Sequence, residues 1–134
     1  MRIKMKEGHD MFLVHPNGSC VKISAVRCVK LAENLPDIEL YTKTSKVRFS
    51  YKDEDSRNEA LSAIHHRLSH CNDSFTRIGN HMFVTESIES IDFGFSRCTI
   101  YTDAGQFTHK WREWENREHV KEKIAESLGL YIKV

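Results

Sequence analysis

The sequence predicts an α+β fold built as a tandem duplication of one unit, in which three or four antiparallel strands are followed by one helix. A five-residue motif recurs in the second half, and a longer stretch repeats at a constant offset. Within each half the apolar period changes from two, typical of strands, to about 3.6, typical of a helix. The 134 residues include only six Gly and two Pro, as in an ordered globular domain.

The repeat defines the two units. GHDMF at 8–12 recurs as GNHMF at 79–83, and Tyr41-Thr42 recurs as Tyr101-Thr102, an offset of 60 that continues without a gap to the end of a helix. We therefore expect a first unit over 1–72 and a second over 73–134. One such unit has little core of its own, so the two should form one compact domain about a pseudo-twofold axis.

The first unit begins with strands expected over 11–14 and 21–31. Alternating apolar residues then predict a hairpin of 38–42 and 47–51. Acidic residues at 53–55 predict the start of a helix over 53–70, because carboxylates complement the helix dipole there. We expect four side chains of this unit to point inward: Leu40, Phe49, Ile64 and Leu68.

The second unit repeats this order. Strands are expected over 82–85 and 88–95, followed by a hairpin of 98–102 and 107–111. A helix over 115–128 should stop at Gly129. The predicted inward side chains are Ile100, Phe107, Ile124 and Leu128. Cys28 and Cys98 fall in apolar positions, which indicates buried thiols.

Composition and motifs restrict the function classes. The net charge of +1 lacks the strongly basic excess of a dedicated nucleic-acid binder. The chain contains no glycine-rich phosphate loop, nucleophile elbow or H-E-x-x-H helix, so we expect a non-enzymatic protein. No apolar segment is long enough for a membrane span or a secretory signal, which predicts a cytoplasmic protein with reduced cysteines.

The strand pattern suggests a binding face opposite the helices. Each unit carries an equivalent outward tyrosine near two cations, a combination that suits bases and phosphates, a protein partner or an anionic small ligand. A second packed sheet or an oligomer interface covering the tyrosines is the competing interpretation. The candidate residues are Tyr41, Arg48 and Lys52, then Tyr101, Lys110 and Arg112, with Trp114 as an exposed anchor.

One cluster carries metal-ligand chemistry. His66 and His70 are four residues apart and share a helical face, and Cys71 adds a thiol that zinc accepts. A structural zinc site needs four ligands, and the second unit lacks equivalents of these residues. We therefore expect no cofactor, with zinc as the alternative and a solvated helix end as the simpler interpretation.

These observations favour a small non-enzymatic cytosolic binding protein that sequesters or blocks a protein or an anionic small molecule. Its size and composition would suit a phage or mobile-element accessory factor. One alternative is a zinc-dependent enzyme or sensor using His66, His70 and Cys71, and another is a nucleic-acid-binding accessory protein. The first 70 residues carry a charge of +3 (12 basic, 9 acidic) and the rest −2 (8 basic, 10 acidic). This asymmetry favours either homo-oligomers formed head to tail or a division of labour between the two units.

Overall fold

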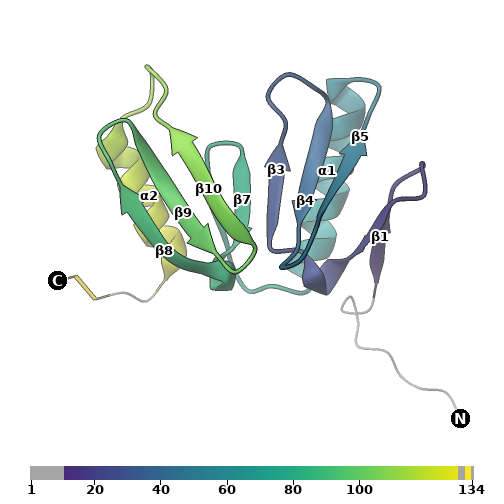
Figure 1. Ribbon diagram of the computed structural model, residues 1–134, viewed down its shortest axis with the longest axis horizontal. Coiled ribbons are helices and arrows are strands. Elements are labelled where there is room, and N and C mark those ends of the chain that lie inside the picture. Colours follow the sequence, from purple (N-terminus) through teal and green to yellow (C-terminus); the bar gives the residue numbers. More distant parts are fainter. Residues whose placement is uncertain (1–10, 130–131, 134) are drawn as a thin grey trace, which may run out of the picture.

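The computed structural model describes residues 11–129 and 132–133 and has an α+β architecture with antiparallel sheets and two helices (Figure 1). The first half contains β1 (Phe12–Val14), β2 (Cys20–Lys22), the 3-10 turn η1 (Ile23–Ala25), β3 (Cys28–Leu31), β4 (Asp37–Tyr41), β5 (Lys46–Ser50) and α1 (Glu54–Ser69). The second half contains β6 (Phe75–Ile78), β7 (His81–Val84), η2 (Thr85–Ser87), β8 (Ile88–Phe93), β9 (Arg97–Thr102), β10 (Gly105–Lys110) and α2 (Arg117–Leu128).

The two halves share one sheet. Its strand order is β5-β4-β3-β7-β6, and the antiparallel pairing of β3 with β7 aligns Cys28 with Phe83 and Lys30 with His81. The strands β10-β9-β8 form a separate sheet, and β1 pairs with β2. The α+β prediction is confirmed. Two strands of the second half thus belong structurally to the sheet of the first half.

Each half has the same order of elements: a hairpin, a 3-10 turn, three antiparallel strands and a helix. The sequence motif matched residues 8–12 to residues 79–83, and the order of elements corrects that match. Residues 8–10 lie outside the part of the chain that the structure describes. The motif match would equate β1 with β7, whereas by order β1 corresponds to β6. Gly18 and Gly79, each with positive φ, then occupy the two equivalent hairpin turns. A tandem duplication stays a prediction.

The strand predictions need two further corrections. The expected strand over 21–31 is interrupted, because η1 separates β2 from β3 and turns the chain between two sheets. The sequence pattern did not predict β6, because this strand has only four residues and begins shortly after the end of α1. The two predicted hairpins are present as β4–β5 and β9–β10, with Ile38 opposite Phe49 and Ile100 opposite Phe107.

Side-chain caps set where the helices begin. Asp53 accepts a hydrogen bond from the Ser56 backbone N–H at 2.8 Å, as its acidic first turn predicted. Asn116 caps α2 in the same way, so that helix starts at Arg117 rather than at 115. Gly129, with φ of 82°, ends it, as predicted. Neither described helix is long and apolar enough to cross a bilayer.

The core consists of two clusters on opposite faces of the five-stranded sheet. On one face α1 buries Ile64 and Leu68. On the other, α2 and the three-stranded sheet pack through Ile124 and Phe107. Leu128 was predicted to point inward but is 36% exposed, because it lies on the last turn of α2. The first cluster also contains Val21, Ile23, Val26, Val29, Ile38, Leu40, Phe49 and Met82, and the second Cys28, Ile78, Phe83, Cys98 and Ile100.

Each helix contributes a buried isoleucine to the core, and α1 also contributes Leu68. We expect Ile64→Ala and Ile124→Ala each to lower the free energy of unfolding by about 2–5 kcal/mol, because truncating a buried side chain leaves a cavity. Leu128→Ala is the matched control and should cost about 1 kcal/mol or less, since its side chain is partly in water. Denaturant unfolding measures all three. An isoleucine variant no less stable than the Leu128 variant would contradict the packing described.

Candidate functional site

The residues predicted to form one outward face do not gather in one place. Tyr41 is half-buried, and its ring meets Phe107 edge-on with centroids 4.9 Å apart. The competing interpretation therefore holds for Tyr41, because the three-stranded sheet packs over it. In the second half Tyr101 is 40% exposed. Lys52 is exposed where the chain leaves β5.

Arg48 is engaged by carboxylates rather than free to bind a ligand. Its guanidinium donates to Glu39 at 2.6 Å and lies 3.5 Å from Asp37. Glu39 is buried, and Lys46 approaches the same carboxylate at 3.4 Å. Burial alone would raise the pKa of Glu39, but the hydrogen bonds and charges of Arg48 and Lys46 hold that pKa below its ordinary value. This face of β4 and β5 is a structural ion-pair network.

Lys110, Arg112 and Trp114 lie at the other end of the β9–β10 hairpin from Tyr101. Lys110 is paired in register with Arg97, whereas Tyr101 pairs with Gln106 beside the turn. The indole of Trp114 is 76% exposed, and the Arg112 guanidinium lies 5.6 Å from its ring centre. These three residues belong to the side of the molecule where β3, β5 and β10 end (Figure 1).

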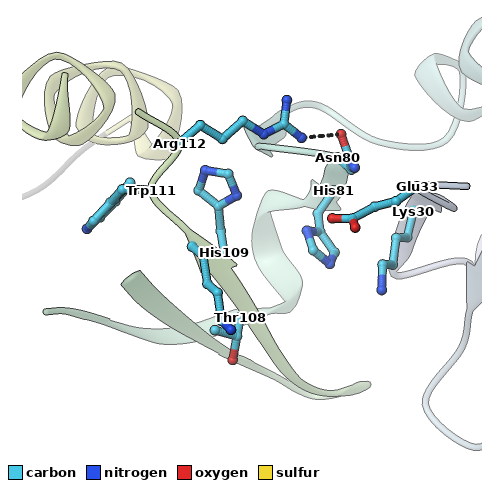
Figure 2. Close-up of a pocket in the computed structure, with 9 residues that line it drawn as sticks. Lys30, Glu33, Asn80, His81, Thr108, His109, Trp111 and Arg112 are labelled. Atoms are coloured by element: carbon cyan, nitrogen blue, oxygen red, sulfur yellow. Dashed lines mark hydrogen bonds between the residues drawn. The ribbon is translucent and has the colours of Figure 1, made fainter. Parts of the chain in front are cut away.

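A cleft of about 430 Å³ opens on that side, between the five-stranded and the three-stranded sheets. Figure 2 shows the end of β10 on one wall and β3 with the β6–β7 turn on the other. Arg112 donates a hydrogen bond across it to the side-chain oxygen of Asn80 at 3.2 Å. A second cleft shares Glu33, Asn80 and Arg112 and extends to the start of α1. The first cleft is lined by Lys30, Glu33, Asn80, His81, Thr108, His109, Lys110, Trp111 and Arg112.

A glycine brings the two walls together. Gly79 has φ of 60°, and a side-chain carbon there would collide with the His109 ring. His109 is held in turn by Glu115, 3.0 Å from its Nε2 atom. Burial opposes the charge on Glu115, but hydrogen bonds from the Arg112 backbone and from His109 keep its pKa low. The position of Asn80 beside Arg112 therefore depends on a turn that only glycine allows.

His81 forms the floor of the cleft. It is 7% exposed, and its Nδ1 atom has no hydrogen-bond partner among the residues that the structure describes. Burial, with smaller contributions from the charges of Lys30 and His109, lowers the pKa of His81 to about 4. Its ring is therefore neutral near pH 7. It stacks on Phe83 and meets Phe107 edge-on, with centroids 5.6 and 5.4 Å apart.

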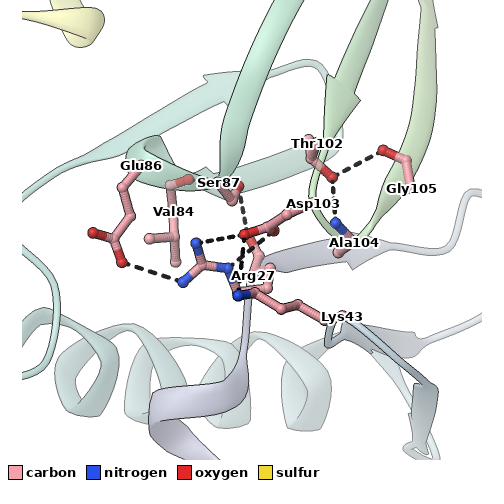
Figure 3. Close-up of polar contacts among 9 residues, drawn as sticks. All are labelled: Arg27, Lys43, Val84, Glu86, Ser87, Thr102, Asp103, Ala104 and Gly105. Atoms are coloured by element: carbon pink, nitrogen blue, oxygen red, sulfur yellow. Dashed lines mark hydrogen bonds and ion pairs between the residues drawn. The ribbon is translucent and has the colours of Figure 1, made fainter.

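A partly buried ion pair joins the halves at the opposite end. The Arg27 guanidinium, 13% exposed, contacts the two carboxylate oxygens of Asp103 at 2.9 and 3.1 Å and Glu86 at 3.2 Å (Figure 3). Lys43 approaches Asp103 at 3.9 Å. A paired, bidentate guanidinium of this kind fixes the β9–β10 turn against the start of β3. These charges are used in holding the structure together.

The predicted metal ligands are only partly brought together. The Nε2 atoms of His66 and His70 are 3.5 Å apart, whereas Cys71 packs beside the α1 core. Within 11–129 and 132–133, no group of three or more His, Cys, Asp or Glu side chains could hold a metal ion. Cys28 and Cys98 are buried as predicted, and burial raises the pKa of Cys98 to about 11.

Sequence comparison assigns no family, since no family model and no curated protein matches this chain. Among solved structures, its fold is similar to the LytTr DNA-binding domain of a Bacillus cereus protein described as a methyl-accepting/DNA response regulator. The TM-score is 0.55 at 16% sequence identity, over 90% of this chain and 96% of that chain. The similarity covers both halves and concerns the fold alone.

Sequence reasoning found one wall of the cleft and missed the other. Lys110 and Arg112 were candidates, but Lys30, Asn80 and His81 were not. The available signal was the GNH triplet at 79–81, which also matches the repeat. Its glycine followed by two polar residues is typical of a tight turn that presents side chains. The partner strand across the cleft is distant in sequence, so no local pattern indicates it.

The buried imidazole gives a pH prediction. Between about pH 6.5 and 4 the unfolded chain binds a proton at His81 that the folded protein does not, so stability should fall as the pH falls through this window. The loss attributable to His81 should be on the order of 3 kcal/mol, at about 1.4 kcal/mol for each pKa unit. His81→Phe keeps a stacked ring without the titration. Its unfolding free energy should vary less over that window than the wild type's, and an unchanged pH profile would contradict the assignment.

Proposed function

We propose that this protein is a non-enzymatic DNA-binding module that contacts duplex DNA with the edge formed by the cleft. The observation that carries the proposal is the joint presence of Arg112, Asn80 and two lysines on one open edge of a fold similar to a DNA-binding domain. The similar domain is not an enzyme, which agrees with the expectation of a binding protein. The nucleic-acid alternative from the sequence thereby becomes the leading function.

The chemistry of the edge suits base recognition. Arginine binds guanine in two-point contacts and asparagine binds adenine likewise. Arg112, which follows β10, is exposed, and Asn80, in the β6–β7 turn, is half-exposed. The contact between Gly79 and His109 fixes the backbone on which these two side chains stand. Such a fixed pair loses little conformational entropy on binding. The Asn80–Arg112 hydrogen bond would be exchanged for contacts with bases.

Lysines flank this pair. Lys110 and Lys30 lie on opposite walls, and Arg57 extends the positive charge along the second cleft. Such cations neutralise phosphates and fix the register of a protein on duplex DNA. Glu33 and Glu54 interrupt the positive surface. With a chain charge of only +1, non-specific attraction should be weak, so affinity would depend on base contacts more than on charge.

The other expectations remain predictions. Sequestration of a protein or an anionic small molecule, a phage or mobile-element role, homo-oligomers and a cytoplasmic location all rest on the sequence alone. The DNA proposal uses Lys110 and Arg112 from the predicted face, with Trp114 beside Arg112 as the exposed aromatic side chain. Tyr41, Arg48 and Tyr101 have no part in it.

Arg112→Ala should weaken binding to a duplex that the wild-type protein selects from a randomised pool. The expected loss is about 10- to 100-fold, because a two-point guanidinium contact with a base is lost. Lys123→Ala is the matched control, since it removes the same charge from the exposed surface of α2. Fluorescence anisotropy at fixed salt measures both.

Two results would contradict the proposal. One is a selection that enriches no sequence. The other is an equal loss in the Arg112 and Lys123 variants, which would show that only net charge matters. Near-wild-type thermal stability of the Arg112 variant is required, and is expected because this side chain is exposed.

A further inference from the structure

A pair of histidines on the last turn of α1 has the geometry of a metal chelate. The rings of His66 and His70 have centroids 4.9 Å apart and an interplanar angle of 87°, and their Nε2 atoms lie 3.5 Å apart. Both residues are exposed. They lie at the end of α1 that leads to β6, whereas the second cleft lies at its start.

The distance between the two nitrogens agrees with tetrahedral coordination. Imidazole nitrogen binds zinc at about 2.0–2.1 Å. Two such bonds at a tetrahedral angle place the nitrogens about 3.3–3.4 Å apart. The observed 3.5 Å is within a few tenths of an ångström of that separation, so one ion could bind both rings with almost no movement of the helix.

The neighbouring side chains leave the pair as a two-ligand site. His65 is held by the guanidinium of Arg77, 3.0 Å from its Nδ1 atom. Cys71 packs against the core cluster under α1. The remaining positions of the ion would therefore be open to water. A cation there is also favoured by the negative end of the helix dipole.

We propose that His66 and His70 chelate one borderline divalent transition metal ion of the Zn²⁺ and Ni²⁺ class. Imidazole nitrogens select these ions over Mg²⁺ and Ca²⁺, which prefer oxygen ligands. The bound ion cross-links residues 66 and 70 and thereby stabilises the last turn of α1. The site is separate from the DNA edge and does not depend on the proposed function.

Calorimetric titration of the full chain with Zn²⁺ tests the site. The wild type should bind one ion per chain through this pair. His66→Ala and His70→Ala should each weaken that binding by at least about tenfold, because two ligands on one rigid turn act at a high effective concentration. His119→Ala, which removes a lone exposed imidazole from α2, is the matched control and should bind as the wild type does.

A second variant and a second measurement separate this site from its alternatives. Cys71→Ala should retain Zn²⁺ affinity, and a loss would overturn the two-imidazole assignment in favour of a thiolate site. Nitrogen NMR of the wild-type imidazoles should show Zn²⁺-dependent shifts at both Nε2 atoms. Shifts at only one ring, or equal weakening in the His119 variant, would overturn the proposal.

Discussion

The packing of the Phe107 ring between the two sheets is the contact on which the rest of the structure depends. Its ring lies against those of Tyr41, His81 and Phe83, with centroids 4.9 to 5.4 Å apart. Aromatic pairs in this edge-on geometry contribute about 0.5–1.5 kcal/mol each beyond their buried area. The contact places β10 beside the five-stranded sheet, and every residue of the cleft depends on that placement.

Different polar contacts fix the junction between the two sheets at its two ends. On the cleft side, Gly79 allows His109 to approach the β6–β7 turn, and Glu115 holds that imidazole. On the far side, the bidentate pair of Arg27 with Asp103 closes the junction. An aromatic centre with polar contacts at both ends explains why the two sheets meet in a defined orientation. Such rigidity is what a site for base recognition needs.

The sequence predicted those parts of the fold that local patterns encode. The two hairpins, the Asp53 cap and the Gly129 stop follow from alternation, capping chemistry and the conformational freedom of glycine. The β3–β7 pairing could not be predicted, because it joins residues more than fifty positions apart and leaves no periodic signal. Tyr41 lies on the face opposite α1, as the alternation predicted, but the three-stranded sheet packs against that face. Strand alternation identifies two faces but cannot show that a second sheet covers one of them.

The candidate site likewise combines residues that a local pattern predicted with residues that only the packing reveals. Lys110 and Arg112 were found because the alternation of the predicted strand indicates both, although β10 ends at Lys110 and Arg112 follows it. Asn80 and His81 come from a turn on the opposite wall, and their importance follows only from the packing of Phe107 and His109. Arg48 was a candidate from the same alternation, and in the folded protein its guanidinium is paired with Glu39.

The central claim is that duplex DNA binds at the edge where the five-stranded and three-stranded sheets meet. Backbone amide chemical-shift mapping of the full chain with its selected duplex tests this directly. The account predicts the largest perturbations at residues 79–81 and 110–112, with residues 41 and 101 nearly unchanged. Perturbations centred on 101 and the β9–β10 turn, with none at 79–81, would contradict it.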